Sequence, residues 1–137
     1  MTDTQIHEGG CHCGAVRIRV RIDLKSGTSR CNCSICTKIG NWGKDVRPAD
    51  FELLSGHDAL ADYTQPGGTT NFHFCRTCGV RPFVHGDAPW MGGEYYGINL
   101  HCLDDQAALG GLPVRWYDGR HNNWENTRDE VSPAPWP

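Results

Sequence analysis

The stretch that decides the fold is GGCHCGAVRIRV, residues 9–20, because it joins a closely spaced pair of cysteines to an alternating run. Apolar side chains then alternate with arginines, in the order Val16, Arg17, Ile18, Arg19, Val20, Arg21 and Ile22. A period of two predicts a β-strand with one buried face and one solvated face. We expect the arginines to face solvent; phosphate binding is the alternative, which the negative net charge of the chain disfavours.

The composition limits the size and the partners of the protein. A chain of 137 residues is long enough for one domain with a modest core, so we predict a single domain over residues 1–137. Lys+Arg 13 against Asp+Glu 16 give a formal net charge of -3, so we do not expect a nucleic-acid partner. The N-terminus lacks the apolar segment of a signal peptide, and no run approaches the roughly 20 apolar residues of a membrane helix. We therefore expect a cytoplasmic protein that does not bind membranes.

The eight cysteines are the strongest chemical signal in the sequence. In a secreted domain they would pair as disulfides, whereas the reducing cytosol favours metal binding or redox chemistry. They fall into close groups, namely Cys11 and Cys13, then Cys31, Cys33 and Cys36, then Cys75 and Cys78, with Cys102 alone. Because C-x-C and C-x-x-C spacings let two thiolates converge on one ion, we favour zinc over structural disulfides.

The rest of the chain is typical of short strands joined by turns. Two apolar runs between residues 41 and 68 are broken by glycine and by Pro-Gly-Gly. The segment TTNFHFCRTCGVRPFVHGD, residues 69–87, predicts a strand, a C-x-x-C turn and a second strand, and EYYGINLHCLDD, residues 94–105, is rich in β-forming residues. Only DDQAALGG, residues 104–111, is expected to form a helical turn, and the tail VSPAPWP, residues 131–137, is expected to be extended. The predicted class is mainly β.

One assembly of the cysteines joins the first and third groups. It contains four thiolates, Cys11, Cys13, Cys75 and Cys78, which is the closed tetrahedral set of a structural zinc. Each pair is followed by a glycine, Gly14 and Gly79, which can adopt the positive φ that a turn around a metal requires. Such a site would tie the first strand to a hairpin far along the chain.

The middle group, Cys31, Cys33 and Cys36, offers three thiolates in a single turn. Three thiolates occupy three corners of a tetrahedron and leave the fourth open, which is the composition of a reactive zinc site. Spacing also allows a different assembly, in which the first group joins Cys31 and Cys33 and the third group is short of partners. Both assemblies remain open at this point.

Three motifs in this order and spacing, GGCHCGAVRIRV, CNCSICTKIG and FCRTCGVRPF, resemble the family of glutathione-dependent formaldehyde-activating enzymes, which also includes the centromere protein V domain. The resemblance covers about residues 9–105. It implies a mainly β, Mss4-like fold of small antiparallel sheets around two zinc ions. By this resemblance the structural zinc is bound by Cys11, Cys13, Cys75 and Cys78, and the catalytic zinc by Cys31, Cys33 and Cys36.

The activity that this resemblance implies is that of a zinc-dependent carbon–sulfur lyase on a small thiol adduct similar to S-hydroxymethylglutathione, with a small-molecule thiol such as glutathione as partner. A zinc held by three thiolates is electron-rich, which suits the binding of a substrate sulfur as thiolate. Family members often read C-H-C-S-x-C-R, whereas this chain has Asn32 and Thr37 at the histidine and arginine positions, with Lys38 as a replacement cation. The alternatives are a non-catalytic zinc-binding module for a thiol ligand and a zinc-ribbon interaction domain.

Several further residues have two interpretations each. Cys102 is expected to be a buried apolar cysteine, with closure of the open zinc corner as the alternative. Supporting or surface roles are favoured over ligand or general-base roles for four histidines, His12, His73, His85 and His101. The segment WYDGRHNNWEN, residues 116–126, is equally suited to lining a polar ligand pocket and to covering a sheet edge.

Overall fold

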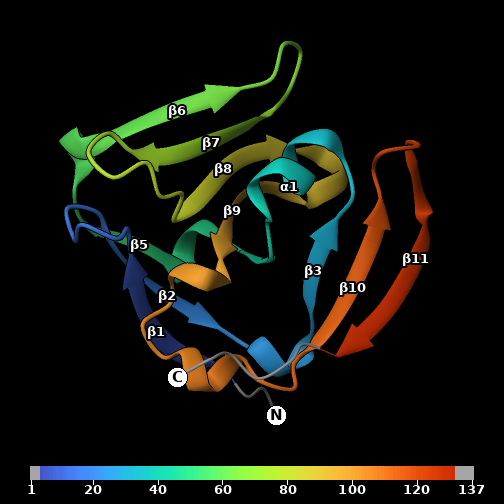
Figure 1. Cartoon of the computed structure of the whole chain (residues 1–137), viewed down its shortest axis with the longest axis horizontal. Helices are drawn as coiled ribbons and strands as arrows, with labels where there is room; N and C mark the ends of the chain where they lie inside the picture. The colour runs from blue at the N-terminus through green and yellow to red at the C-terminus, as the bar shows by residue number, and fades with distance from the viewer. Residues whose placement is uncertain (1–3, 132–137) are drawn as a thin grey trace.

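The computed structural model describes residues 4–131 and is built almost entirely from strands (Figure 1). The strands are β1 (Gln5–Gly10), β2 (Arg17–Ile22), β3 (Thr28–Cys31), β4 (Gly43–Val46), β5 (Phe51–Ser55), β6 (Leu60–Thr64), β7 (Thr70–Cys75), β8 (Phe83–Ala88), β9 (Gly93–Asn99), β10 (Pro113–Asp118) and β11 (Asn123–Val131). The mainly β prediction is confirmed. Residues 132–137, where we expected an extended tail, lie outside the described part of the chain.

A three-stranded antiparallel sheet has the order β1-β2-β5. The alternation in β2 is confirmed, because Ile18 and Val20 are buried while Arg19 and Arg21 are exposed. Arg19 contacts Glu8 across the strand pair at 2.9 Å, and Arg17 contacts a carboxylate from a later loop. The arginine face is therefore a solvated face with ion pairs, as expected.

The second sheet has eight strands in the order β11-β10-β3-β4-β9-β8-β7-β6. All of its neighbours run antiparallel except β3 and β10, which pair in parallel and bring Cys31 opposite Tyr117. Because parallel strands cannot be joined by a tight turn, this pair links segments far apart in the sequence. In Figure 1 the larger sheet runs from β6 and β7 at the top to β11 at the right, with β1, β2 and β5 at the lower left.

The main core lies between the two sheets. Ile18 and Val20 of β2 pack in one cluster with Phe83 of β8, Ile98 of β9 and Val114 of β10. These side chains are almost completely buried, so their removal from water is the main source of stability for the sheet packing. The core fixes the ends of β3 and β7, from which the cysteine segments emerge.

The structure corrects the prediction of a single helical turn. The expected turn is present as a 3₁₀-helix over Gln106–Leu109, but α1, an α-helix over Ser34–Ile39, was not predicted. The α1 sequence SICTKI is only six residues long and has three β-branched residues, so its apolar positions were too few for periodicity to predict a helix. Cys33 precedes the helix, and Gly40 ends it with φ 64. Within residues 4–131, no helix is long and apolar enough to cross a membrane.

Candidate metal centres

The first metal centre contains four cysteines from two turns. Cys11 and Cys13 follow β1, and Cys75 and Cys78 come from the turn after β7, and all four sulfur atoms lie within 4.8 Å of one another. The Cys13 sulfur is 3.6 Å from the sulfurs of both Cys11 and Cys75. Sulfurs at the corners of a zinc tetrahedron lie about 3.8 Å apart, so these four residues fit a zinc ion. The alternative assembly with Cys31 and Cys33 does not occur.

Backbone N–H groups surround this four-cysteine cluster and favour thiolates. The N–H of Val16 points to the Cys11 sulfur at 3.3 Å, and that of Thr77 to the Cys75 sulfur at 3.4 Å. Backbone hydrogen bonds, first from Cys13 and then from Val80, lower the pKa of Cys78 to about 6. Thiolates are the form that binds zinc, so these hydrogen bonds prepare Cys75 and Cys78 for a metal.

The two glycines after the cysteine pairs adopt the expected conformation. Gly14 has φ 84 and Gly79 has φ 76, and each closes a turn by donating its N–H to the carbonyl of the first cysteine of its pair. A side chain at these positions would be strained in the left-handed region. The cluster is enclosed on one side, where Cys11 and Cys75 are 7% and 0% exposed, and reaches the surface at Cys13.

The second centre contains three cysteines around the start of α1. The sulfurs of Cys31, Cys33 and Cys36 lie within 4.8 Å of one another, and no fourth ligand from the described residues completes the group. Cys31 ends β3, Cys33 precedes α1, and Cys36 lies one turn into the helix. All three are half-exposed, whereas the four-cysteine cluster combines two buried members, Cys11 and Cys75, with the exposed Cys13 and the half-exposed Cys78. The arrangement has the thiolates for a zinc ion and an open side.

Cys31 and Cys36 have different proton affinities. The neighbouring Cys36 thiol, followed by the backbone N–H groups of Cys33 and Gly119, lowers the pKa of Cys31 to about 5 against the opposing effect of burial. The same pairing with Cys31, together with burial, raises the pKa of Cys36. Cys31 therefore loses its proton before Cys36, and a bound metal would displace the proton of Cys36.

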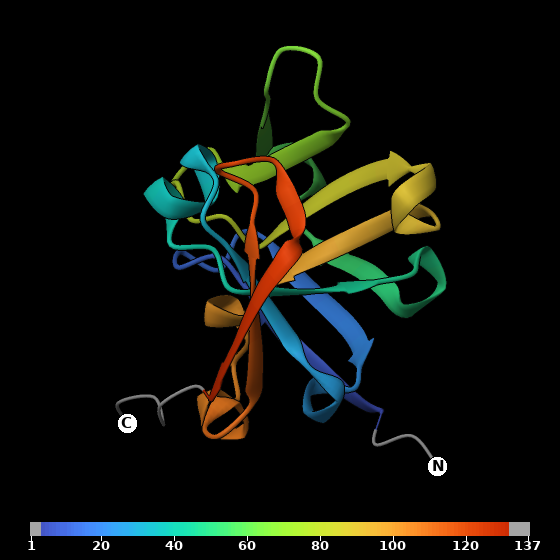
Figure 2. The ribbon, with the colours of Figure 1, turned by 90° about the vertical axis from the view of Figure 1, so that its right-hand side faces the viewer.

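A turn from the far end of the chain covers the three-cysteine cluster. This turn, residues 119–122, joins β10 to β11 and lies beside α1 in Figure 2. Gly119 approaches so closely that a Cβ at this position would be 2.6 Å from the Cys31 sulfur and 2.6 Å from the Trp124 ring. Glycine is therefore required by the contact itself.

Arg120, the next residue of this turn, is the cation that sequence reasoning missed. It donates from its backbone N–H to Asn32 Oδ1 at 2.8 Å and from Nε to the Asn32 carbonyl oxygen at 3.0 Å. Its Nη2 lies 3.3 Å from Thr37 Oγ1. Thr37 stands at the position where the family pattern has an arginine. Arg120, from a distant part of the chain, places its guanidinium beside Thr37 instead. Lys38, the replacement named from sequence, lines a different cavity.

Asp118 holds the turn through its carboxylate. Asn32 Nδ2 donates to Asp118 Oδ1 at 2.9 Å, and His121 Nδ1 lies 2.8 Å from the same oxygen. Hydrogen bonds from Asn32, His121 and Asn126 lower the pKa of Asp118 to about 2. Residues 116–126 belong to the β10–β11 hairpin that forms the edge of the larger sheet rather than covering it, and several of them line a cavity of about 300 Å³ beside Asn32.

Comparison with known proteins agrees with this geometry. The model of the family described as glutathione-dependent formaldehyde-activating enzyme matches residues 6–118. The chain belongs to this family. A Halomonas elongata protein whose name contains the same enzyme description is 38% identical over 94 residues, 61% of this chain. The alignment spans only 57% of that relative's length.

A solved structure supports the fold assignment. The crystal structure of a Rhodobacter sphaeroides protein matches with a TM-score of 0.66 and 31% identity, covering 80% of this chain and 98% of that chain. This likeness concerns the architecture of the two proteins. The family assignment and the fold are therefore supported by independent comparisons.

Cys102 of this family member does not join the three-cysteine cluster. Its thiol donates to the Arg81 carbonyl oxygen at 3.6 Å, and its charged neighbours are Cys11 and Cys78 of the other cluster. Burial, followed by these two thiols, raises the pKa of Cys102 to about 12. A thiol that stays protonated is a poor zinc ligand, which agrees with the expected role as a packing residue.

The candidate histidines also lie apart from the clusters. Within residues 4–131, neither cysteine cluster includes a histidine. His73 packs against Phe83, His85 contacts Glu94 at 2.7 Å, and His101 packs edge-on against Trp42. His12 is exposed. These positions agree with the supporting and surface roles expected from the sequence.

Proposed function

We propose that this protein is a zinc-dependent carbon–sulfur lyase that acts on a small thiol adduct of the S-hydroxymethylglutathione type. Membership of the glutathione-dependent formaldehyde-activating family supports the substrate class. In this proposal Cys11, Cys13, Cys75 and Cys78 bind a structural zinc, and Cys31, Cys33 and Cys36 bind a catalytic zinc. The single zinc-binding domain over residues 1–137 is part of the same proposal.

The observation that carries the proposal is the contrast between the two clusters. One has four sulfurs with two almost fully buried members, so a metal there would have no position for a substrate. The other has three partly exposed sulfurs under a turn that brings a guanidinium nearby. Only the second offers both an open side and a cation next to it.

The overall reaction breaks the carbon–sulfur bond of the adduct. The hydroxyl oxygen becomes the aldehyde oxygen, the bonding electrons return to sulfur, and the hydroxyl proton ends on the thiol; the reverse reaction forms the adduct. A zinc ion bound at the cluster would stabilise the sulfur as thiolate.

The residues of the chain hold and orient this site. The Cys36 thiol, followed by the N–H groups of Cys33 and Gly119, lowers the pKa of Cys31 and so favours the thiolate form that binds metal. Arg120 places a positive charge beside the cluster, where it can orient an anionic substrate. The turn around Gly119 excludes water from one side of the cluster, because it leaves no space at the Cys31 sulfur.

Paired cysteine variants test the division of roles. We expect Cys36→Ser to abolish exchange between thiol plus formaldehyde and the adduct, measured by NMR, while the circular dichroism spectrum stays that of the wild type. Native mass spectrometry should then count one zinc per chain instead of two. We expect Cys75→Ser to unfold the protein, because it breaks the closed site that ties distant turns together.

The outcomes separate this proposal from the alternatives. Equal loss of fold in both variants would remove the distinction between structural and reactive sites. Thiol binding in calorimetry without any exchange in the wild type would indicate a non-catalytic binding module. DNA binding with a steep salt dependence would indicate a zinc-ribbon interaction domain.

A further inference from the structure

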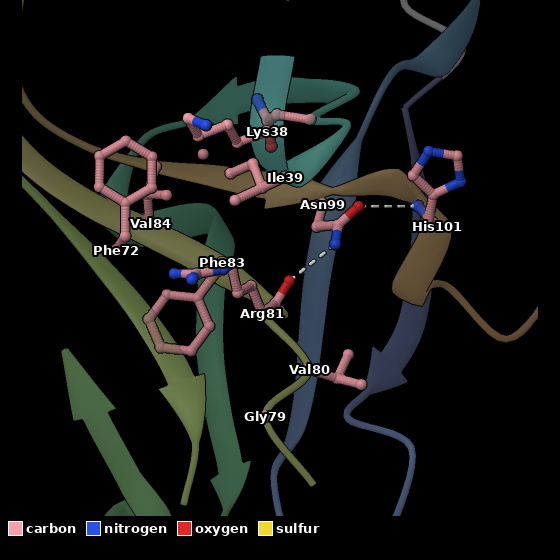
Figure 3. Close-up of a pocket in the computed structure, with 12 residues that line it drawn as sticks. Lys38, Ile39, Phe72, Gly79, Val80, Arg81, Phe83, Val84, Asn99 and His101 are labelled. Atoms are coloured by element: carbon pink, nitrogen blue, oxygen red, sulfur yellow. Dashed lines mark hydrogen bonds between the residues drawn. The ribbon is translucent and has the colours of Figure 1, made fainter. Parts of the chain in front are cut away.

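A groove of about 460 Å³ lies between α1 and the segment that leads from the four-cysteine turn into β8. Figure 3 shows Lys38 and Ile39 of α1 on one side of this groove and Val80, Arg81 and Phe83 on the other. Neither cysteine cluster uses these side chains. The volume is within the range of cavities that bind small molecules.

The groove has an unneutralised positive charge. Lys38 and Arg81 line it, and its lining contains no aspartate or glutamate. Among the described residues, neither cation forms an ion pair with a carboxylate. Two unpaired cations that face one cavity make it attractive for an anion.

Arg81 lies in the groove wall, and among the described residues no carboxylate neutralises its guanidinium. Its guanidinium carbon lies 5.4 Å from the centre of the Phe74 ring, and its Nη1 is buried without a hydrogen-bond partner among residues 4–131. A buried charged donor without an acceptor destabilises the folded protein. An anionic ligand in the groove would reduce this penalty by neutralising the guanidinium.

The rest of the lining combines the polar side chains of Asn41, Asn99 and His101 with a larger apolar part. Ile39, Val80 and Phe83 belong to this apolar part, together with Phe72. Strongly hydrated inorganic anions gain nothing from such a wall, whereas an organic carboxylate can bury its carbon chain there. The groove therefore suits a small organic acid more than free phosphate or sulfate.

The position of the groove relates it to the three-cysteine cluster. Cys36 belongs to the cluster, and Lys38 and Ile39 follow it within the same short helix. At about 100° per residue, Ile39 lies about 60° around the helix from Cys36 and Lys38 about 160°, so the groove starts beside the thiols and extends around the flank of α1. A helix is about 10 Å wide, which a ligand of two or three extended residues spans at roughly 3.3–3.6 Å per residue.

We infer that this groove binds the carboxylate arm of a peptide-like thiol substrate whose sulfur lies at the three-cysteine cluster. Lys38 and Arg81 recognise the carboxylate, and the apolar wall packs against the adjoining carbon chain. This inference rests on the proposed function for the substrate class, but the groove itself does not depend on a bound metal.

Binding of S-methylglutathione tests the inference, because its blocked sulfur leaves the carboxylates as the main recognition groups. By calorimetry, Lys38→Gln and Arg81→Gln should each weaken binding about tenfold relative to wild type. Lys25→Gln, which changes an exposed lysine outside the groove, should bind like wild type. Esterification of both carboxylates of the probe should weaken wild-type binding by at least the same factor.

Three results would overturn the inference. The first is that wild type does not bind S-methylglutathione, the second is that both groove variants bind it as tightly as wild type does, and the third is that wild type binds the ester as tightly as the free acid. Lys38 is exposed and has no structural role in the core, so its variant remains informative if Arg81→Gln does not fold. Cys36→Ser separates the two proposals. If Cys36→Ser loses turnover but binds S-methylglutathione as wild type does, the inferred role of the groove is supported. If wild type is active and the groove variants have the same activity and probe binding as wild type, the proposed function is supported and the role of the groove is excluded.

Discussion

Arg120 contacts Asn32, 88 positions earlier in the chain, through its backbone N–H at 2.8 Å from Asn32 Oδ1 and through Nε at 3.0 Å from the Asn32 carbonyl oxygen. Asn32 lies between two cysteines of the three-cysteine cluster. These two bonds therefore fix a cation beside the cluster from a hairpin that has no cysteine of its own. The family pattern supplies this charge from within the cysteine motif; here the tertiary structure supplies it.

Arg120→Gln should reduce activity with little effect on stability. Arg120 is exposed, so its hydrogen bonds contribute about 1 kcal/mol or less to the free energy of unfolding. We expect a roughly tenfold lower kcat/KM for the thiol adduct, because the charge beside the cluster is lost. Arg21→Gln, on the exposed face of β2, is the matched control and should leave kcat/KM unchanged. An Arg120→Gln enzyme with wild-type kcat/KM would exclude a role in substrate orientation.

Gly119→Ala should loosen the three-cysteine centre selectively. The added Cβ would lie 2.6 Å from the Cys31 sulfur and from the Trp124 ring, so the turn or the sulfur must move. We expect a loss of about 1–3 kcal/mol in the free energy of unfolding and weaker binding of the second zinc. Native mass spectrometry during stepwise addition of a chelator should show this zinc leaving earlier than in wild type. Identical release curves would show that the turn does not support the centre.

Thr28 connects β3 to the start of β10 through a buried pair of hydrogen bonds. Trp42 Nε1 donates to Thr28 Oγ1 at 2.7 Å, and the Thr28 hydroxyl donates to the Pro113 carbonyl oxygen at 2.8 Å. Thr28→Val keeps the shape but leaves the indole N–H and this carbonyl without partners. We expect a loss of about 1–3 kcal/mol in urea unfolding. Thr28→Ser keeps the hydroxyl and should lose less; equal losses would assign the effect to packing.

His101 should make the folded protein less stable as the pH falls below neutral. Burial, followed by the charge of Arg30, lowers the pKa of His101 below the ordinary value of 6.5, against a hydrogen bond with the Gly40 backbone. As the pH falls below about 6.5, His101 therefore binds a proton more readily in the unfolded chain than in the folded protein. The contribution of neutral His101 is therefore present above about pH 6.5 and lost as the pH falls through the range below it.

Two measurements check this pH dependence. The ring protons of His101 should titrate by NMR with a midpoint below 6.5. In zinc-saturating buffer, His101→Gln should show a smaller fall in unfolding free energy between about pH 7 and pH 5 than wild type. A His101 midpoint at or above 6.5 would contradict the prediction.

The sequence by itself determined the features that contiguous residues encode. The alternation over residues 16–22 predicted β2 and its buried face, because side chains of a strand alternate between faces. The spacing within each cysteine group, together with Gly14 and Gly79, predicted turns that present thiolates to a metal. These features depend on local geometry and need no knowledge of distant segments.

The tertiary structure decided how these pieces meet. Spacing allowed two assemblies of the cysteine pairs, and the packing of the turn after β7 against the turn after β1 selected one. The parallel register of β3 with β10 placed Tyr117 opposite Cys31, which brought Gly119 and Arg120 onto the three-cysteine cluster. Such long-range pairing depends on the global packing of the core, so no local pattern in residues 30–40 or 116–126 could specify it.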